Sequence, residues 1–496
     1  MANHSPLYTA AQVRELDRIA IEEAGIPGYT LMSRAGEAAW RVVKSEWPDA
    51  SSFVVVCGTG NNGGDGYVLA RLAMEGGYSV RILQLGDAAS IKGEARTARE
   101  ALLAAGGEVI PFDVETLKTG DVIIDALLGT GLERPLNGAW RDAVTAINAL
   151  RIPVLAIDIP SGLHSDTGAV LGATVNADHT VTFIGRKRGL YTGEGPEHCG
   201  VITLVDLQVP VTIYDQVTAN AQLLSEPPLG PLSRPRPRTA HKGDHGHLLI
   251  VGGDRGMSGA VQLAGMAALR VGAGLVSLAT RPEHAALTAA SCPELMCHDV
   301  ASARTLRTLL ARATAVAIGP GLGRSRWAQE LLSVVLESSL PLVVDADALN
   351  LLAQEPVVRD NWVLTPHPGE AGRLLDAATA EVQADRYTAV CAIARRFGGV
   401  VVLKGAGTLV CAGDGPIDVC IAGNPGMASG GMGDVLTGVI GGLLVQGLVP
   451  VQAATAGVCV HAHAGDRAAQ DGERGMMATD VIARLRTVMQ IMCESG

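Results

Sequence analysis

Strand-length apolar runs alternate with helical patterns through most of this chain, and this alternation restricts the fold more than any other feature. Strand, helix and strand in succession form βαβ units, in which the strands lie parallel and the crossovers are right-handed. The sequence therefore predicts an α/β protein built on parallel sheets. The expected strands lie at residues 53–57, 80–85, 121–127, 154–159, 179–184, 200–205, 247–253, 275–280, 315–323, 341–349, 362–370 and 400–410.

Several helices are expected at definite places. Thr9 and Gln12 have the spacing of a capping box, so a helix should begin near residue 10. Further helices are expected at 31–44, after the glycine-rich loop 58–66 as far as Met74, and at 259–271. The segment 435–465 contains no Asp, Glu, Lys or Arg, but glycines and a proline interrupt it. This pattern favours two buried helices joined at 447–450 over a membrane span.

The alternation lapses between about residues 212 and 240, which indicates a division of the chain. Residues 226–238 hold five prolines and no sustained periodicity, as is typical of a linker. A chain of 496 residues is also too long for one ordinary core. The two halves share no evident repeat, so we expect two domains of different fold, at 1–222 and 241–496, joined by a linker at 223–240.

Charge and cysteine usage restrict the partners and the compartment. The formal net charge is −11 and there is no long basic run, which argues against nucleic acid as a partner. The nine cysteines form no C-x-x-C pair, and several lie in apolar runs, as reduced core cysteines do. Residues 1–17 lack the pattern of a signal peptide. We therefore expect a cytoplasmic protein that binds neither nucleic acid nor a membrane.

The segment 424–438, NPGMASGGMGDVLTG, is the most specific indication of chemistry. Its glycines allow successive backbone N–H groups to converge, and a glycine turn that opens a helix forms an anion site. Asp434 follows at once, so it would lie close to a phosphate bound there. This arrangement favours phosphoryl transfer, with Asp434 taking the proton from the attacking hydroxyl. The alternative is that Asp434 only caps the helix.

Other loops of the second half end strands in the same way. Glycines occur at 319–323, 367–370 and 404–408, and Lys404 is placed to reach a phosphate. Asp345 and Asp347 follow another strand. Loops from several parallel strands meet at one sheet edge, so together they predict a site for a nucleotide and a phosphate acceptor. His461 and His463 make a poor metal pair, because they would face different sides of a helix. His241, His245 and His247 cluster beside the linker, but no cysteine follows them at zinc spacing.

In the first half, polar residues also follow predicted strands. The loop 58–66 suits recognition of phosphate or ribose, although its glycines do not match the usual dinucleotide pattern. Asn62, Asp125, Asp158 and Ser161 all fall at strand ends, where ligands bind in open parallel sheets. One carboxylate with amide and hydroxyl oxygens would suit a hard cation of low charge. A second carboxylate would then serve as acid or base, unless these aspartates only cap turns.

These motifs resemble a known family over nearly the whole chain. NNGGDG, DALLGTGL and DIPSG resemble the NAD(P)H-hydrate epimerase domain, which is Rossmann-like with a three-layer parallel sheet. HKGDHGHLLIVGG, GPGLG, DADALN, TPHPGE, LKGAGT and NPGMASGGMGD resemble the ADP-dependent NAD(P)H-hydrate dehydratase domain, which is ribokinase-like. The motifs are long and occur in the family's order. The chain is therefore similar to the fused NAD(P)H-hydrate repair enzymes.

The resemblance implies roles for individual residues. In the first domain it places the hydrated dinucleotide on Asn61, Asn62, Gly63, Gly64, Asp65, Gly129, Thr130, Gly131, Leu132, Glu133, Arg134, Pro135 and Asp158. It places potassium on Asn62, Asp125 and Ser161. In the second domain it places the hydrated dinucleotide on Ala260, Gly323, His367 and Asp434. It places ADP on Lys404, Gly405, Ala406, Gly407, Thr408 and Gly433, with magnesium as the metal of that step.

The implied activity is repair of NADH and NADPH that have added water across the 5,6 double bond of the nicotinamide ring. The first domain would interconvert the C6 epimers, with Asp158 as the acid–base group, and the second would dehydrate the S epimer with ADP, releasing AMP and phosphate. The implied assembly is a homo-oligomer. Two alternatives stay open from the residues alone: a kinase for a small hydroxylated vitamin precursor, and a non-catalytic nucleotide-binding scaffold.

Overall fold

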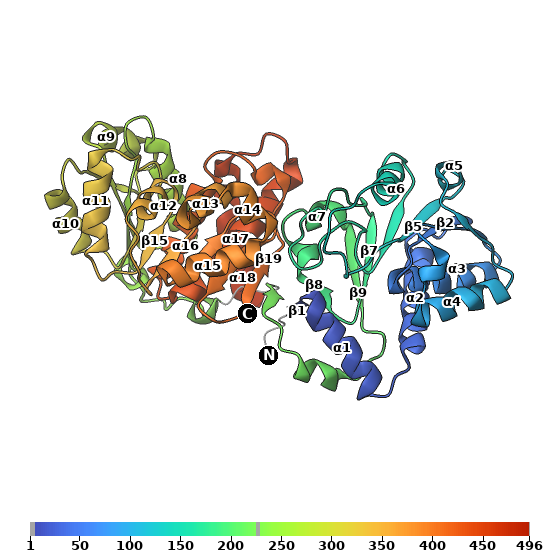
Figure 1. Ribbon diagram of the computed structural model, residues 1–496. Coiled ribbons are helices and arrows are strands. Elements are labelled where there is room, and N and C mark those ends of the chain that lie inside the picture. The colour runs from blue at the N-terminus through green and yellow to red at the C-terminus, as the bar shows by residue number, and fades with distance from the viewer. Residues whose placement is uncertain (1–4, 225–228, 496) are drawn as a thin grey trace. The chain divides into compact units, whose positions relative to one another are not determined.

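The computed structural model describes residues 5–224 and 229–495 (Figure 1). Contacts along the chain define two compact units. Pro6–Ala221 forms the first unit, and the described residues from Gln222 onward form the second. Part of the expected linker, 225–228, lies outside the described residues. The residue that follows it, Leu229, is buried in the hydrophobic core of the second unit.

The first unit contains a parallel sheet of seven strands in the order β4-β3-β2-β5-β6-β7-β9. These strands are β2 Ser52–Cys57, β3 Ser79–Gln84, β4 Val109–Pro111, β5 Val122–Ala126, β6 Val154–Ile157, β7 His179–Phe183 and β9 Val201–Val205. A short parallel pair, β1 Ser5–Tyr8 and β8 Arg186–Lys187, accompanies them. The helices are α1 Ala10–Glu22, α2 Gly28–Glu46, α3 Asn61–Glu75, α4 Gly93–Ala104, α5 Val114–Leu117, α6 Ala139–Asn148 and α7 Gly195–His198.

Both faces of this sheet are buried, which makes the unit three layers deep. Phe53 and Val55 of β2 face the core that α1–α4 form, whereas Val54 and Val56 face the core of α5 and α6. Successive side chains of a strand point to opposite faces, so a strand covered on both sides reads as a continuous apolar run. This confirms the expected parallel α/β class. The capping box at Thr9 and Gln12 is also present.

One prediction for the first unit is wrong in detail. Residues 58–66 are not a loop, because α3 begins at Asn61 and NNGGDG forms its first turns. Small residues are needed there because the helix starts against other backbone. A Cβ atom on Gly63 would lie 2.3 Å from the carbonyl oxygen of Gly58, and one on Gly58 would lie 1.8 Å from that of Leu127. The glycines therefore allow the close packing at the start of this helix.

The second unit contains a mixed sheet in which the run β13-β12-β11-β14-β15-β16-β17 is parallel and β17-β18-β19 is antiparallel. Its strands are β10 Ala221–Leu223, which begins one residue before the second unit, β11 His247–Val251, β12 Leu275–Thr280, β13 Met296–Asp299, β14 Ala315–Ile318, β15 Leu342–Val344, β16 Trp362–Leu364, β17 Val400–Leu403, β18 Thr408–Ala412 and β19 Ile417–Cys420. Several strands are shorter than their apolar runs, because the remaining residues form loops or start helices. The run 400–410 is two strands joined by a turn.

The helices of the second unit lie along and around this sheet. They are α8 Ser258–Arg270, α9 Pro282–Ser291, α10 Ala303–Leu310, α11 Arg326–Leu336, α12 Ala346–Gln354, α13 Pro368–Leu375, α14 Thr379–Ala384, α15 Arg386–Phe397, α16 Met432–Leu444, α17 Pro450–Ala468 and α18 Ala478–Ser495. The apolar segment 435–465 forms the buried helices α16 and α17, as predicted. Among the described residues, no helix is both long and apolar enough to cross a membrane.

Candidate active sites

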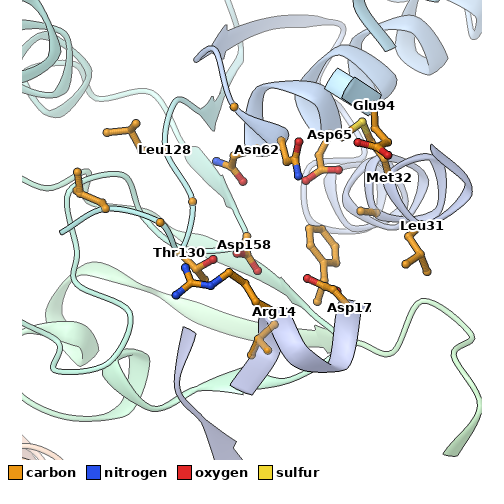
Figure 2. A pocket seen from close by; sticks show the side chains of 18 of the residues that line it. Arg14, Asp17, Leu31, Met32, Asn62, Asp65, Glu94, Leu128, Thr130 and Asp158 are labelled. Carbon is orange, nitrogen blue, oxygen red and sulfur yellow. The ribbon is translucent and has the colours of Figure 1, made fainter. Parts of the chain in front are cut away.

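A cavity of about 940 Å³ opens in the first unit, where the ends of the central strands meet α1, α2 and α3 (Figure 2). Most of the residues predicted to hold the dinucleotide line it: Asn61, Asn62, Asp65, Gly129, Thr130, Gly131, Leu132, Glu133, Arg134 and Asp158. Gly63, Gly64 and Pro135 do not line the cavity. Gly63 and Gly64 are buried within the packing of α3.

Of the residues predicted to hold potassium, Asp125 and Ser161 are hydrogen-bonded to each other, and Asn62 lines the cavity. Asp125 is fully buried, and it accepts hydrogen bonds from the Ser161 amide at 2.8 Å and the Ser161 hydroxyl at 2.7 Å. Burial raises the pKa of Asp125 to about 6, although these hydrogen bonds oppose the shift. The buried side-chain amide of Asn62 has no hydrogen-bond partner for its nitrogen or its oxygen within the described chain.

This donor set fits a monovalent cation. A buried amide oxygen without a partner is costly, and a bound ion would satisfy it. A Cβ atom on Gly129 would lie 3.5 Å from the Asn62 oxygen, so the glycine leaves that oxygen accessible from the loop. Nowhere in the described residues do three or more His, Cys, Asp or Glu side chains form a group that could hold a metal ion.

Asp158 lies where β6 ends, in an unusual backbone conformation. Its φ of 67° is in the left-handed region, which costs of the order of 1 kcal/mol for a residue other than glycine. The conformation is held by a 2.7 Å hydrogen bond from its amide to the Val181 carbonyl. The Asp158 carboxylate pairs with the ammonium of Lys187, whose side chain is 1% exposed. The strand end therefore fixes a paired carboxylate at the cavity wall.

Asp17 and Lys187 are among the residues of this cavity that sequence reasoning missed. Asp17 lies one turn from Val13 on α1, beside the buried Leu16. The sequence signal for it was therefore an acidic residue next to the apolar stripe of a helix. Burial raises the pKa of Asp17 to about 6; Lys187 opposes the shift and Asp158 adds to it. Burial also raises the pKa of Asp65 well above its ordinary value, and the neighbouring aspartates add to the effect.

In the second unit, Lys404 and Asp345 form the centre of the predicted nucleotide site. The Lys404 ammonium donates to Asp345 at 2.8 Å, and the Thr437 hydroxyl of α16 donates to the other Asp345 oxygen at 2.8 Å. Glu370 lies 3.8 Å from the ammonium. Burial would lower the pKa of Lys404, but the carboxylates of Asp345 and Glu370 outweigh it and the pKa is raised. The lysine is therefore charged and fixed in place.

The glycine turn opens a helix, as predicted. Gly431 is the N-cap of α16 with φ 91°, and Asp434 occupies the first turn, so the alternative of Asp434 as the N-cap is wrong. Gly433 lies beside the lysine, since a Cβ atom on it would lie 3.3 Å from Lys404 Nζ. The Asp434 side chain makes no hydrogen bond to any described residue. Burial, with the nearby Asp345 and Asp347, raises its pKa to about 7.

The loop after β17 and the start of α13 complete this site. Gly405 has φ 135°, which strongly favours glycine, and its carbonyl accepts a 2.8 Å hydrogen bond from the Thr408 hydroxyl. Buried Arg386, which sequence reasoning missed, donates to the carbonyls of Leu403 and Lys404 at 3.2 Å. Ala406 is exposed and Gly407 is buried in the turn. His367 caps α13 through its ring nitrogen and forms a capping box with Glu370.

The two other residues predicted to meet the dinucleotide lie on neighbouring loops and helices. The Gly323 amide donates to Asp347 at 2.9 Å, and Asp347 in turn raises the pKa of Asp434. Ala260 lies on α8, and a Cβ atom on Gly321 would lie 3.2 Å from the Cβ of Ala260. His461 is buried and its pKa falls to about 4, whereas His463 is exposed. The two histidines face different sides of α17, as predicted.

Comparison with known proteins covers both units. Residues 28–189 match the family described as YjeF-related protein N-terminus, and residues 248–487 match the family described as NAD(P)H-hydrate dehydratase. The bifunctional NAD(P)H-hydrate repair enzyme of Coxiella burnetii is 50% identical, over 97% of this chain and 99% of that protein. The Escherichia coli enzyme of the same name is 46% identical, over 97% and 94%.

Solved structures resemble the second unit. A ribokinase-like superfamily protein from Enterococcus faecalis is 28% identical with a TM-score of 0.50, covering 55% of this chain and 96% of that one. An ADP/ATP-dependent NAD(P)H-hydrate dehydratase from Bacillus subtilis, co-crystallised with ATP and Mg²⁺, is 29% identical with a TM-score of 0.47, covering 52% and 94%. With the full-length relatives and both matched domains, the chain belongs to the family of bifunctional NAD(P)H-hydrate repair enzymes.

Proposed function

We propose that this protein restores hydrated NADH and NADPH in two steps, one in each unit. The first unit interconverts the R and S hydrates at C6. The second unit dehydrates the S hydrate with ADP as co-substrate and releases AMP and phosphate. The observation that carries the proposal is the Asp434 carboxyl in the first turn of α16, which has no hydrogen-bond partner in the described chain and lies near the charged Lys404.

The chemistry of the second step explains why a kinase-like site suits a dehydration. Restoring the ring requires loss of hydroxide from C6, and the conjugate acid of hydroxide has a pKa of about 15.7. A phosphate group has a second pKa of about 6, so it is a far better leaving group. Once the C6 oxygen carries a phosphoryl group, the lone pair of the ring nitrogen can expel it. Loss of a proton from C5 of the resulting cation then restores the 5,6 double bond, so the reduced nicotinamide forms without a stable phosphoester.

The residues of the second unit take complementary roles. Asp434 accepts the proton of the C6 hydroxyl, and Lys404 with the N–H groups at 431–433 stabilises the transferring group. The loop 404–408 holds ADP. Magnesium is commonly held by one or two carboxylates together with phosphate oxygens, which it neutralises. Glu370 and Asp347, which lie beside Lys404 and Asp434, are the carboxylates we assign to it. The hydrated ring meets Ala260, Gly323, His367 and Asp434.

The first unit binds the hydrated dinucleotide in its 940 Å³ cavity. Asn61 and Asp65 of α3, together with the loop 129–135, hold the nucleotide, and Asp158 is the acid–base group. Asn62, Asp125 and Ser161 would hold potassium, and the Asn62 amide, which has no hydrogen-bond partner among the described residues, supports this assignment. The ion supplies fixed positive charge at the strand ends.

One experiment tests both steps. Purified protein is incubated with mixed hydrated NADH epimers, ADP and magnesium, and the absorbance of the reduced nicotinamide is followed. Recovery of all the hydrate supports both activities, whereas recovery that stops at the S fraction shows that the first unit is inactive. Formation of a stable phosphate ester in place of NADH would instead indicate a kinase for a small alcohol.

We also propose that the protein acts in the cytoplasm as a homo-oligomer. All nine cysteines are free thiols, which suits a reducing compartment. Light scattering of the purified protein coupled to size-exclusion chromatography measures the assembly directly. A mass equal to one chain of 51.1 kDa would contradict the oligomer.

A further inference from the structure

The cavity of the first unit contains a carboxyl group that has no role in the function proposed above. Asp17 is one of four α1 residues that line it, with Val13, Arg14 and Ile21. Within the described chain its carboxyl makes neither a hydrogen bond nor an ion pair. Figure 2 shows Asp17, Asp65 and Asp158 around the same space. An acid so placed is available to a ligand in the cavity.

Asp17 and Asp158 line the same cavity, but they differ in their charged partners. The carboxylate of Asp158 pairs with buried Lys187, which also donates to the Thr182 hydroxyl at 3.0 Å. That ammonium gives the Asp158 carboxylate a partner of opposite charge. Among the residues that the structure describes, Asp17 has no such partner. When the environments of two carboxyl groups differ in this way, one group is suited to act as the base of a reaction and the other as its acid.

The groups that face Asp17 favour its protonated form. Burial in the wall of the cavity is the largest effect, the ammonium of Lys187 opposes it, and the charge of Asp158 adds to it. The charge of Asp17 in turn raises the pKa of Asp65 of α3 and of Tyr214 in the short helix Val211–Gln216. The resulting pKa of about 6 lets Asp17 carry a proton in a useful fraction of molecules near neutral pH.

The charge of the cavity also favours one chemical route of epimerisation. Among the described residues that line it, the acidic Glu94, Glu133 and Asp158 balance the basic Arg14, Arg134 and Lys187, and Asp65 keeps its proton because burial raises its pKa. Once Asp17 has given up its proton, its carboxylate therefore leaves an excess of negative charge in the cavity. An excess of negative charge stabilises a cation that forms during a reaction. Loss of the C6 hydroxyl as water leaves such a cation, because the ring nitrogen then shares its lone pair with C6.

We propose that Asp17 is a second catalytic residue of the epimerase cavity. It is the acid that protonates the C6 hydroxyl, which then leaves as water. This inference rests on the proposed function of the first unit. Asp17 gives its proton to the hydroxyl oxygen, the C6–O bond breaks, and the nitrogen lone pair forms the N1–C6 π bond. Water then adds to the other face of C6 and gives a proton to Asp158. Exchange with solvent returns both carboxyl groups to their starting states.

The kinetic test replaces Asp17 by asparagine in the full chain. With the R hydrate and no ADP, we expect kcat for epimerisation to fall by about 10²-fold or more, with KM within about threefold of wild type. Dehydration of the S hydrate with ADP should stay at the wild-type rate, which controls for protein quality. Glu15→Gln, on the exposed side of the same helix, is the matched control and should leave both rates unchanged.

The outcomes separate the inference from the proposed function. Wild-type protein that does not epimerise the R hydrate would overturn the function of the first unit. Wild-type protein that does, with an Asp17→Asn variant within about threefold of its kcat, would overturn only the role of Asp17.

An isotope experiment tests the route without any variant. Wild-type protein epimerises the R hydrate in water enriched in ¹⁸O, with ADP omitted so that the second unit stays idle, and the hydrates are analysed by mass spectrometry. Departure of the hydroxyl as water predicts one solvent oxygen in each molecule of S hydrate formed, after subtraction of a reaction without protein. Retention of the original oxygen would show that the ring opens instead and would overturn the proposal.

Discussion

Replacing Asp434 by asparagine tests the central assignment in the second unit. The substitution keeps the size of the side chain and removes the base. Proton transfer by a positioned side chain contributes about 10²–10⁴-fold, so we expect kcat for dehydration of the S hydrate to fall by about 10²-fold or more. ADP affinity should change by less than about threefold, because Lys404 and the glycine-turn N–H groups still bind the phosphates.

The same substitution should stabilise the fold, which separates a lost base from a damaged structure. Burial and neighbouring carboxylates raise the pKa of Asp434 from 3.8 to about 7. The folded state therefore binds more protons than the unfolded state between these two values, and stability falls as the pH rises across that window. At about 1.4 kcal/mol per pH unit the penalty is at most about 4 kcal/mol, and solvent access reduces it to roughly 1–2 kcal/mol.

The assay combines steady-state kinetics, ADP titration calorimetry and urea unfolding. At about pH 8 the Asp434→Asn variant should be more stable than wild type, and the difference should vanish near pH 4. Asp414→Asn, in the exposed turn between β18 and β19, is the matched control and should change neither activity nor stability. A variant that keeps more than about a tenth of the wild-type kcat, or that unfolds more easily at about pH 8, would refute the reasoning.

Four further expectations follow from the two sites. Wild-type kcat/KM for dehydration should fall as the pH drops below about 7, because protonated Asp434 cannot accept a proton; a flat profile would contradict this. Lys404→Met leaves Asp345 buried without its ion pair, so urea unfolding should show a loss of about 2–4 kcal/mol together with weakened ADP binding. Asn62→Ala, or replacement of potassium by tetramethylammonium, should slow epimerisation and spare dehydration, with equal loss of both rates as the contrary result. Gly63→Ala should lower the melting temperature of the first unit, because its Cβ would lie 2.3 Å from the Gly58 carbonyl oxygen.

Sequence patterns predicted those parts of the molecule that depend on neighbours along the chain. The βαβ alternation, the Thr9 capping box and the buried pair α16 and α17 are local periodicities, and all three are present. The start of α3 was placed incorrectly, because asparagines and glycines are typical of loops. Packing against Gly58 and Leu127 overrides that preference in the fold.

The missed site residues reach their positions through tertiary contacts. Asp17 and Lys187 are far apart in the chain, and only the fold brings both to the cavity that contains Asp158. Arg386 was missed for the same reason, since its guanidinium supports the Lys404 loop from another element. A basic side chain that is buried beside a predicted strand carries no motif of its own. Its role becomes visible only when its partner is known.

The two units reach a similar electrostatic arrangement from different folds. In each, a lysine pairs with one strand-end aspartate, Lys187 with Asp158 and Lys404 with Asp345. A second aspartate then faces the site without a hydrogen-bonded partner within 5–224 and 229–495, Asp17 in one unit and Asp434 in the other. Because the lysine charge is already neutralised, burial dominates for the second acid and raises its pKa to about 6 or about 7. Each unit thereby gains a carboxyl group that can exchange protons near neutral pH, which both an epimerisation and a phosphoryl transfer at a C6 hydroxyl require.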